Sequence, residues 1–338
     1  MLVSLVVTSG LFALLFRFLP DVRLRWKDVT TGAVVTAVLF TIGQQLIGLY
    51  LGQSSIASTY GAAGSMMILL LWVYYSCQIL LYGAEFTRVW AARHGARPKP
   101  ESFAVRLAWA LGYFAEVTHY VAGGTIEGAT GLSRARNCVA EDGTFSDARF
   151  ELEDRSVRML FDEHSWSWDD NPFVGTPQLN GLKMVNMLLS NWDTKDRRDV
   201  SRGSNTAIFE HRVARWGREA RYLITDWGGA MGKWGSNVVS RGRWDVEGFE
   251  AQTQTFVTDV RDRYVCFAYQ GQRTNEIARG ITMEDAAWFY DIARRLSEDA
   301  LRQGLLACGA TEEEAGRFAR ALHNRIRQIG EACTIKAG

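Results

Sequence analysis

Three polar residues in the middle of the chain are of the types that hold a metal ion together with phosphate groups. Asp193 lies in the polar segment Asn191–Asp196, Asn205 follows further along the chain, and Asp226 is followed by Trp-Gly-Gly. Carboxylate and amide oxygens are ligands that Mg²⁺ accepts, and a carboxylate can also orient a hydroxyl group. If the three side chains converge, the sequence predicts a site for Mg²⁺ bound to phosphates.

The elements around these residues predict that they do converge. Leu179–Leu189 is apolar at helical spacing, so the segment after it is a loop that leaves the end of a helix. Two short β runs follow, Thr206–Glu210 and Arg221–Thr225. If they pair as a hairpin, the amide and the second aspartate fall at the same end of it. The alternative interpretation is that these polar residues only cap a helix and a hairpin.

This order of a helix, a loop aspartate, an asparagine, a hairpin and then Asp-aromatic-Gly resembles the catalytic centre of the protein-kinase-like superfamily, in the branch with HipA-type and phosphoinositide kinases. The resemblance implies that Asp193 is the catalytic-loop aspartate and that Asn205 and Asp226 bind the metal. It also implies Mg²⁺ and ATP as cofactors and a membrane-anchored phosphotransferase as the enzyme. The segment from Asp193 to Asn205 is longer than in that superfamily, so Asp196 or Asp199 is an alternative to Asp193.

The part of a kinase-like domain that covers the nucleotide is not evident in the sequence. No glycine-rich phosphate loop and no strand lysine with a partner glutamate precede residue 190, and residues 123–128 are no convincing substitute. Glu101 is in place for the helix glutamate of a small lobe, but apolar segments occupy the positions of its strands. We therefore also weigh a pseudokinase-like binding module, a lobe supplied by another chain, and a fusion joined near residues 97–101.

The first part of the chain contains three apolar segments, at about residues 1–19, 29–51 and 62–84. Each is about 19 to 23 residues long, which at a rise of 1.5 Å per residue spans a hydrocarbon core of about 30 Å. Buried helices of a soluble protein are the alternative, but such helices seldom run this far without a polar face. The sequence therefore predicts three membrane-spanning helices.

Charged residues beside the apolar segments predict their orientation. Arg23, Arg25 and Lys27 lie between the first two segments, whereas residues 52–61 between the second and third carry no charge. Four basic residues follow the third segment: Arg88, Arg93, Arg97 and Lys99. Because basic loops face the cytoplasm, we expect Met1 outside and the remainder of the chain in the cytoplasm.

The predicted fold is a bundle of three transmembrane helices, residues 1–94, followed by a mixed α+β soluble domain, residues 101–338. Residues 95–100 read as a short linker between them. Near the C-terminus the periodicity predicts two helices, at residues 282–307 and 311–332. The lipid bilayer is the partner that this fold implies.

Four segments of the membrane part carry a second resemblance: Phe18–Lys27, Ser58–Ser65, Leu71–Ser76 and Gly83–Phe86. Over residues 1–97 the chain closely resembles the C-terminal part of the YihY/BrkB family of inner-membrane proteins, once labelled ribonuclease BN. The resemblance implies a multi-pass protein of the bacterial inner membrane, with transport as the candidate role. Members normally have more helices, so it also implies that the first helices are missing here or supplied by another chain.

Composition argues against two other kinds of site. The formal net charge is +1, and the basic residues of the first part adjoin apolar runs rather than form a separate arm. We therefore expect no nucleic-acid partner, and the nuclease label gains no support. The five cysteines form no CxxC pair and have no histidine at ligand spacing, which argues against a zinc site.

Overall fold

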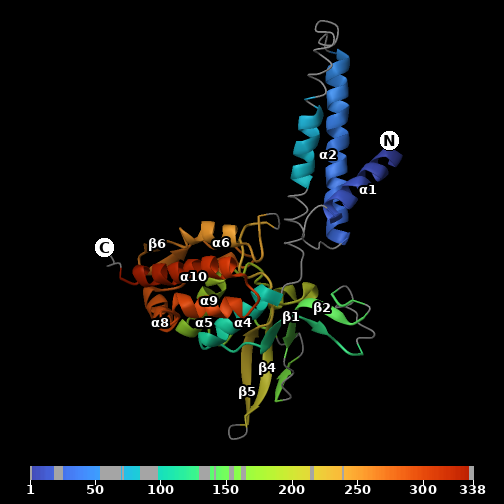
Figure 1. Cartoon of the computed structure of the whole chain (residues 1–338). Coiled ribbons are helices and arrows are strands. Elements are labelled where there is room, and N and C mark those ends of the chain that lie inside the picture. Colours follow the sequence, from blue (N-terminus) through green and yellow to red (C-terminus); the bar gives the residue numbers. More distant parts are fainter. Residues whose placement is uncertain are drawn as a thin grey trace. The chain divides into compact units, whose positions relative to one another are not determined.

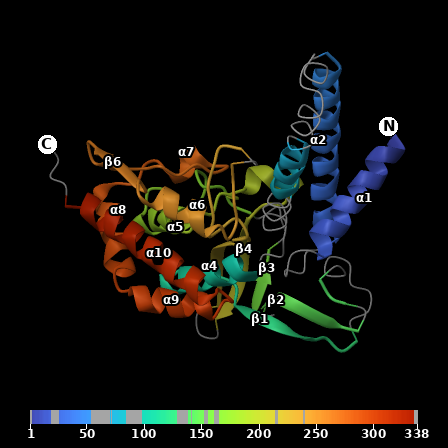
Figure 2. The same cartoon turned by 45° about the horizontal axis from the view of Figure 1, so that its top comes forward.

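The structure is a computed structural model of the 338-residue chain. It describes residues 2–18, 26–53, 70, 72–83, 98–128, 138–140, 142–151, 156–160, 165–213, 217–237 and 240–334. The chain divides into two compact units, Met1–Gly95 and Ala96–Gly338. In Figure 1 the first unit is coloured blue to cyan and the second runs from green to red; Figure 2 gives a second view of both.

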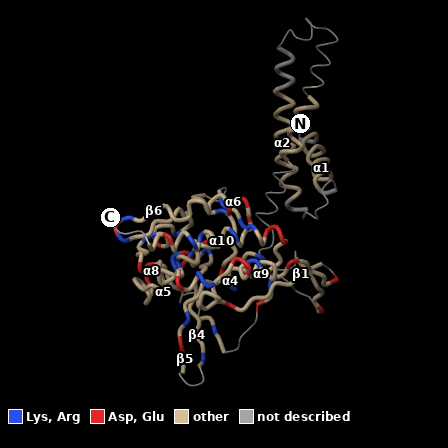
Figure 3. The backbone as a smooth tube through the Cα atoms, turned by 60° about the vertical axis from the view of Figure 1, so that its left-hand side comes forward, with Lys and Arg blue, Asp and Glu red and all other residues tan. Residues whose placement is uncertain are grey.

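The described part of the first unit is helical. It contains α1 (Leu2–Phe18), α2 (Trp26–Gln53) and a further helical stretch at residues 72–83. Figure 3 shows almost no charged residue along α1 and α2, whereas both signs of charge are scattered over the second unit. Within α2, Val29–Leu46 is long and apolar enough to cross a membrane, and no other described helix is.

The prediction of three membrane helices is therefore borne out for one of them. At 1.5 Å per residue, the 17 residues of α1 span about 26 Å, which is less than the hydrocarbon core of about 30 Å. The third predicted segment, residues 62–84, lies partly outside the described residues. So do most of the charged residues on which the predicted orientation depends.

Two glycines let these helices approach one another closely. A Cβ atom on Gly83 would lie 2.0 Å from Oγ1 of Thr36 on α2, and one on Gly43 would collide with the ring of Tyr75. The Tyr75 hydroxyl donates a hydrogen bond to the carbonyl oxygen of Leu39, 3.0 Å away. Contacts between small residues are typical of helix packing in membranes, where lipid leaves little hydrophobic drive for association.

The second unit is a mixed α+β domain, as the sequence predicts. Its strands form three antiparallel sheets: β1 (Thr118–Thr125) with β2 (Thr144–Glu151); β3 (Val157–Met159), β4 (Thr206–Val213) and β5 (Gly217–Ile224) in that order; and β6 (Val257–Arg261) with β7 (Tyr264–Phe267). Its helices are α4 (Pro98–Ala110), α5 (Pro177–Leu188), α6 (Val246–Thr253), α7 (Thr274–Ile277), α8 (Met283–Ala293), α9 (Glu298–Leu306) and α10 (Glu312–Ala332). A short 3₁₀ helix, Arg197–Arg202, lies between α5 and β4.

Two helix boundaries differ from the prediction. α4 begins at Pro98, inside the predicted linker, because proline is tolerated in the first turn of a helix. The predicted helix at residues 282–307 is broken into α8 and α9, because the Ser297 hydroxyl accepts a hydrogen bond from the Ala300 amide, 3.1 Å, and so caps a new helix. α10 begins where the sequence predicts it, and Thr311 and Glu314 form a capping box at its start.

One apolar core holds the helices of the second unit together. Its largest fully buried side chains include those of Trp168, Phe249, Phe289 and Phe318. The last turn of α5 is buried in this core, and burying one such side chain contributes about 1.5–3 kcal/mol. The core therefore fixes α5, and with it the polar loop that follows.

Candidate functional site

The loop that holds Asp193 begins where α5 ends. α5 stops at Leu188, and Ser190 takes a left-handed backbone conformation with a φ of 55° that turns the chain. The Asn191 backbone amide donates to the carbonyl oxygen of Asn186, 2.9 Å, and its side-chain amide donates to Oδ1 of the same residue, 3.1 Å. Asp193 is then only 6% exposed. The prediction that a helix leads into this loop is confirmed.

Asn205 and Asp226 lie at the same end of the β4–β5 hairpin, as the two β runs predict. Thr206 is opposite Ile224 at that end. The Thr225 amide donates to the carbonyl oxygen of Asn205, 2.9 Å, and Asp226 comes next along the chain. The register of the hairpin therefore places the amide and the carboxylate side by side.

Asn205 connects this hairpin to the loop of Asp193. Its Nδ2 donates to the Asp193 carbonyl oxygen, 2.6 Å, and its backbone amide donates to the Lys195 carbonyl oxygen, 3.1 Å. The turn after Asp226 also reaches the loop, because a Cβ atom on Gly229 would lie only 3.0 Å from the Cβ atom of Asp193. The structure thus brings the three predicted residues together, and a glycine makes the closest approach possible.

Charge and burial act in opposite directions on Asp193. Burial raises the pKa of its carboxyl group, Lys195 lowers it, and the negative charge of Asp226 raises it. The net effect is a pKa above the ordinary value. Nζ of Lys195 lies 3.9 Å from Oδ1 of Asp193, an ion pair without a hydrogen bond.

Two buried oxygens of the loop have no hydrogen-bond donor among the described residues: Oδ1 of Asp193 and Oδ1 of Asn191. A Cβ atom on Gly229 would touch both residues, which places the two oxygens in one neighbourhood. Leaving such an oxygen unsatisfied costs about 1–3 kcal/mol. A ligand hydroxyl that donates a hydrogen bond, or a cation nearby, would relieve that cost.

The oxygen atoms of this site are of the kind that binds Mg²⁺. No group of three or more His, Cys, Asp or Glu side chains lies together in the described part of the chain. Mg²⁺, however, is usually held by one or two carboxylates, with water and phosphate oxygens as its other ligands. Oδ1 of Asp226 accepts a hydrogen bond from the Gly228 amide, 2.7 Å, which leaves its second oxygen for a ligand.

Asp196 and Asp199, the two alternatives to Asp193, are held by arginines. The guanidinium of Arg198 lies 2.5 Å from Asp196, and that of Arg273 lies 2.5 Å from Asp199. Both aspartates also cap the 3₁₀ helix. Burial acts to raise the pKa of Asp199, but hydrogen bonds from Arg273 and Arg202 hold it below its ordinary value. Asp193 is therefore the loop aspartate with an oxygen left for a ligand.

Two arginines that sequence reasoning missed lie beside the loop. The guanidinium carbons of Arg241 and Arg243 are 5.1 and 4.8 Å from the ring centroid of Trp192, and the Trp192 indole donates to the Gly242 carbonyl oxygen, 2.9 Å. The charge of Arg243 lowers the pKa of Asp193. The only signal for them is the Arg-Gly-Arg sequence that follows Asp226 at a short distance. Positive charge here favours an anionic ligand.

Arg325 of α10 is the second feature that the sequence analysis missed. Its side chain is fully buried and donates to the Leu188 carbonyl oxygen, 2.9 Å, and to the Ser190 hydroxyl, 2.8 Å. It also donates to the Phe249 carbonyl oxygen, 2.9 Å. It therefore ties α10 to the end of α5, from which the Asp193 loop starts. An arginine within the apolar face of a helix is the sequence signal for such a role.

Glu101, the residue in place for a small-lobe glutamate, lies in the first turn of α4. It forms an ion pair with Arg149 of β2, 3.0 Å. Between Thr118 and Glu151, the described residues form a sheet of two strands, β1 and β2. This region thus contains two features that a small lobe would have: the helix glutamate and a sheet, which here has two described strands.

Comparison with known proteins gives matches for the first part of the chain. Residues 1–107 match the family described as Virulence factor BrkB. The similar proteins are UPF0761 membrane proteins: one from Tolumonas auensis is 33% identical over 87 residues, and one from Chromobacterium violaceum is 39% identical over 85 residues. A third, from Idiomarina loihiensis, is 31% identical over 101 residues.

These matches cover limited parts of both partners. They include 25%, 25% and 30% of this chain and 29%, 20% and 36% of the respective relatives. The chain thus spans about a third of the length of these relatives or less. No solved structure matches the chain. The resemblance of residues 1–97 is supported by these findings, whereas that to kinases has no counterpart among them.

Proposed function

We infer that this chain is a bacterial inner-membrane protein of the BrkB/UPF0761 type, and we propose that it anchors a Mg²⁺- and ATP-dependent phosphotransferase unit. The membrane part rests on the family match of residues 1–107 and on the apolar length of α2. The enzymatic part rests on one observation: the β4–β5 hairpin holds Asn205 and Asp226 against the buried carboxylate of Asp193.

Each residue of the site has a role in this proposal. Asp226 and Asn205 would hold Mg²⁺, and the bound ion would neutralise phosphate charge. Asp193 would orient the acceptor hydroxyl and take its proton. Its raised pKa supports this role, because a carboxylate titrating nearer the working pH is the stronger base. Lys195 and Arg243 place positive charge where the transferred phosphate would develop negative charge.

A binding module without catalysis is the second candidate. Its support lies in the small two-stranded sheet and in Glu101, whose carboxylate is already paired with Arg149 rather than with a strand lysine. In that case the site would bind a nucleotide but would lack the groups that align its phosphates. A lobe supplied by another chain would restore them.

For the membrane unit we propose anchoring rather than transport. Among its described residues, the fully buried polar side chain is that of Thr36. Its hydroxyl donates to the Gly32 carbonyl oxygen within the same helix, 2.7 Å. A transport pathway usually requires polar groups that face a cavity, and this hydroxyl is satisfied by its own helix.

Titration of the full chain in lipid nanodiscs with Mg²⁺-ATP tests the proposal. Asp226→Ala removes a full charge facing the ion and should weaken nucleotide binding by about tenfold or more. Asp299→Ala is the matched control, because this carboxylate is exposed on α9 and should leave binding unchanged. Asp193→Asn should spare binding and abolish transfer of labelled phosphate from ATP.

The outcomes separate the two candidates. Binding that depends on Asp226, together with transfer that depends on Asp193, supports the phosphotransferase. Binding that depends on Asp226 with no transfer by the unaltered chain supports the binding module. Equal affinity of the unaltered chain and Asp226→Ala, or no binding by either, would remove the metal site and leave a structural role for these polar residues.

A further inference from the structure

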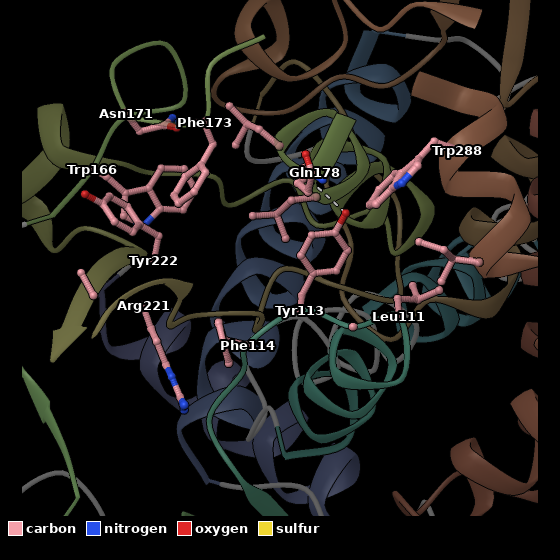
Figure 4. A pocket seen from close by; sticks show the side chains of 15 residues that line it. Leu111, Tyr113, Phe114, Trp166, Asn171, Phe173, Gln178, Arg221, Tyr222 and Trp288 are labelled. Atoms are coloured by element: carbon pink, nitrogen blue, oxygen red, sulfur yellow. Dashed lines mark hydrogen bonds between the residues drawn. The ribbon is translucent and has the colours of Figure 1, made fainter. Parts of the chain in front are cut away.

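A cavity lies at the opposite end of α5 from the Asp193 loop. It has a volume of about 340 Å³ and is bounded by the end of α4, the first turns of α5, β5 and α8 (Figure 4). This volume is within the range of sites for small organic molecules. The residues of the Asp193 site do not line it.

Aromatic rings form two facing walls of this cavity. Figure 4 shows Trp166, Phe173 and Tyr222 on one side and Tyr113 and Trp288 on the other. On the first side, the rings of Phe173 and Tyr222 meet edge to face with their centroids 5.2 Å apart, and Trp166 lies 6.4 Å from Tyr222. Each ring is thereby fixed by a neighbour.

A glycine of α5 allows the second wall to lie where it does. A Cβ atom on Gly181 would be 2.2 Å from the Tyr113 hydroxyl oxygen and 2.9 Å from the Trp288 ring. The Tyr113 hydroxyl donates to the Gln178 carbonyl oxygen, 3.0 Å, which fixes its ring against α5. The space between the two walls is thus built by fixed rings, and flat rings stack well in such a space.

The polar groups of the cavity indicate which hydrogen-bonding groups a ligand would carry. The Trp166 indole is already bonded to the Leu223 carbonyl oxygen, 3.1 Å. The structure records no hydrogen bond to a described residue for the hydroxyl of Tyr222 or for the indole N–H of Trp288. Both side chains are half-buried. In Figure 4 the Tyr222 hydroxyl points away from the space between the walls, which leaves the Trp288 indole as the donor of the two that favours a ligand with a hydrogen-bond acceptor.

The charge at the cavity argues against an ionic ligand. The Arg221 guanidinium lies 2.6 Å from Glu219 and 4.2 Å from the Phe114 ring centroid, and in Figure 4 its nitrogens point away from the space between the walls. Its charge is therefore already neutralised, so an anion gains little. A cation would meet aromatic faces, but no carboxylate lines the cavity to pair with it.

We propose that this aromatic cavity binds a compact, flat, uncharged ring compound that accepts a hydrogen bond from the Trp288 indole. The stacking walls select a planar ring over a saturated one. The indole donor selects a heteroaromatic compound over a plain hydrocarbon. This site is independent of the proposed nucleotide site and stands whether or not that proposal holds.

Ligand-detected NMR on the full chain in nanodiscs tests the proposal with three probes. Quinoline is flat, neutral and an acceptor; choline is a cation; cyclohexanol is neutral but not flat. Quinoline should give saturation transfer well above that of empty nanodiscs, and the other two should not. Choline or cyclohexanol binding as well as quinoline would overturn the assigned ligand class.

Two variants locate the binding. Leu182→Trp fills the cavity from α5 and should abolish the quinoline signal, while Leu306→Trp, at a half-buried leucine of α9, should keep it. Trp288→Phe removes the indole donor and should weaken quinoline binding roughly threefold to tenfold. Trp109→Phe, at an exposed tryptophan of α4, should have no effect.

Leu182→Trp is interpreted only if its thermal transition matches that of the unaltered chain. If it fails to fold, Trp288→Phe decides, because it keeps an aromatic ring at this half-buried position. A quinoline signal that is the same in the unaltered chain, in folded Leu182→Trp and in Trp288→Phe would overturn the proposal.

Discussion

Three carboxylates near the start of the soluble unit share one guanidinium. The Arg149 side chain lies 3.0 Å from Glu101 and 2.6 Å from Glu151. Glu116 is half-buried nearby. Its burial, and then the charge of Glu151, raises the pKa of Glu116 from 4.5 to about 7, against the opposing effect of Arg149. The surroundings of Glu116 thus favour its protonated form.

This arrangement predicts a pH-dependent stability. Because the pKa of Glu116 is higher in the folded chain than in the unfolded chain, the folded state binds this proton more tightly. Its contribution is fully present below about pH 4.5 and is lost as the pH rises through about 7. Glu116→Gln removes that loss and should stabilise the soluble unit at pH 8 by at most about 3 kcal/mol.

Denaturant unfolding at pH 8 and pH 5 measures this effect. The gain from Glu116→Gln should shrink markedly at pH 5, where the wild-type carboxyl is protonated in the folded chain. Glu127→Gln, at an exposed position, is the control and should change stability little at either pH. A gain from Glu116→Gln that is the same at both pH values would contradict the assignment.

At the scale of elements, the local sequence predicts helices and strands where interactions between neighbouring residues determine them. The β runs that begin at Thr206 and end at Thr225 pair as predicted. Apolar residues lie on both faces of this hairpin: Phe209 and Leu223 belong to a small separate cluster, whereas Ile224 lies in the main core. The break at Ser297 was missed, because the apolar periodicity continues across it while a cap decides where the chain restarts its helix. Neither the hairpin β6–β7 nor α6 was predicted.

The residues of the candidate site also fall into those that the local sequence predicts and those that it does not. Asp193, Asn205 and Asp226 were found because each directly adjoins a predicted element, so their meeting follows from the hairpin register. Arg243 and Arg325 were not found, because each reaches the loop or its start only through the tertiary fold. The Arg-Gly-Arg sequence and an arginine on the apolar face of a helix are signals in the sequence, but neither specifies which element the arginine contacts.

Arg325 gives a prediction about these packed helices. Its guanidinium also donates to the Thr253 hydroxyl, 2.8 Å, and lies 3.6 Å from the Phe249 ring centroid. Arg325→Ala would leave the carbonyl oxygen of Leu188 and the hydroxyl of Ser190 without this donor inside a dry core. We expect a loss of about 3–5 kcal/mol in the free energy of unfolding.

Chemical denaturation of the full chain measures that loss. Arg320→Ala is the matched control on the same helix, because this arginine is exposed and should change the unfolding free energy by less than about 0.5 kcal/mol. Equal stability of the two variants would show that water replaces the Arg325 guanidinium without cost.

At the scale of the whole molecule, the chain joins two units with different surfaces. α1 and α2 expose large apolar side chains, such as Val6, Leu11 and Leu46, that an aqueous surface would not favour. The second unit instead buries apolar residues in a main core and in a small cluster of β4 and β5, and it carries both signs of charge outside (Figure 3). The family match extends to residue 107, within α4, so it runs past the boundary between the units.

The orientation of the two units across the membrane is the remaining prediction. Basic residues at 23–27 and 88–99, with an uncharged segment at 52–61 between them, place both basic segments and the soluble unit in the cytoplasm. Alkaline phosphatase, which is active only in the periplasm, should therefore be inactive when fused after Gly338 and active when fused after residue 57. Green fluorescent protein exported in unfolded form stays dark, so it should fluoresce only in the first fusion. Phosphatase activity after Gly338 would place the soluble unit outside, where ATP is scarce, and would remove the phosphotransferase proposal together with the predicted topology.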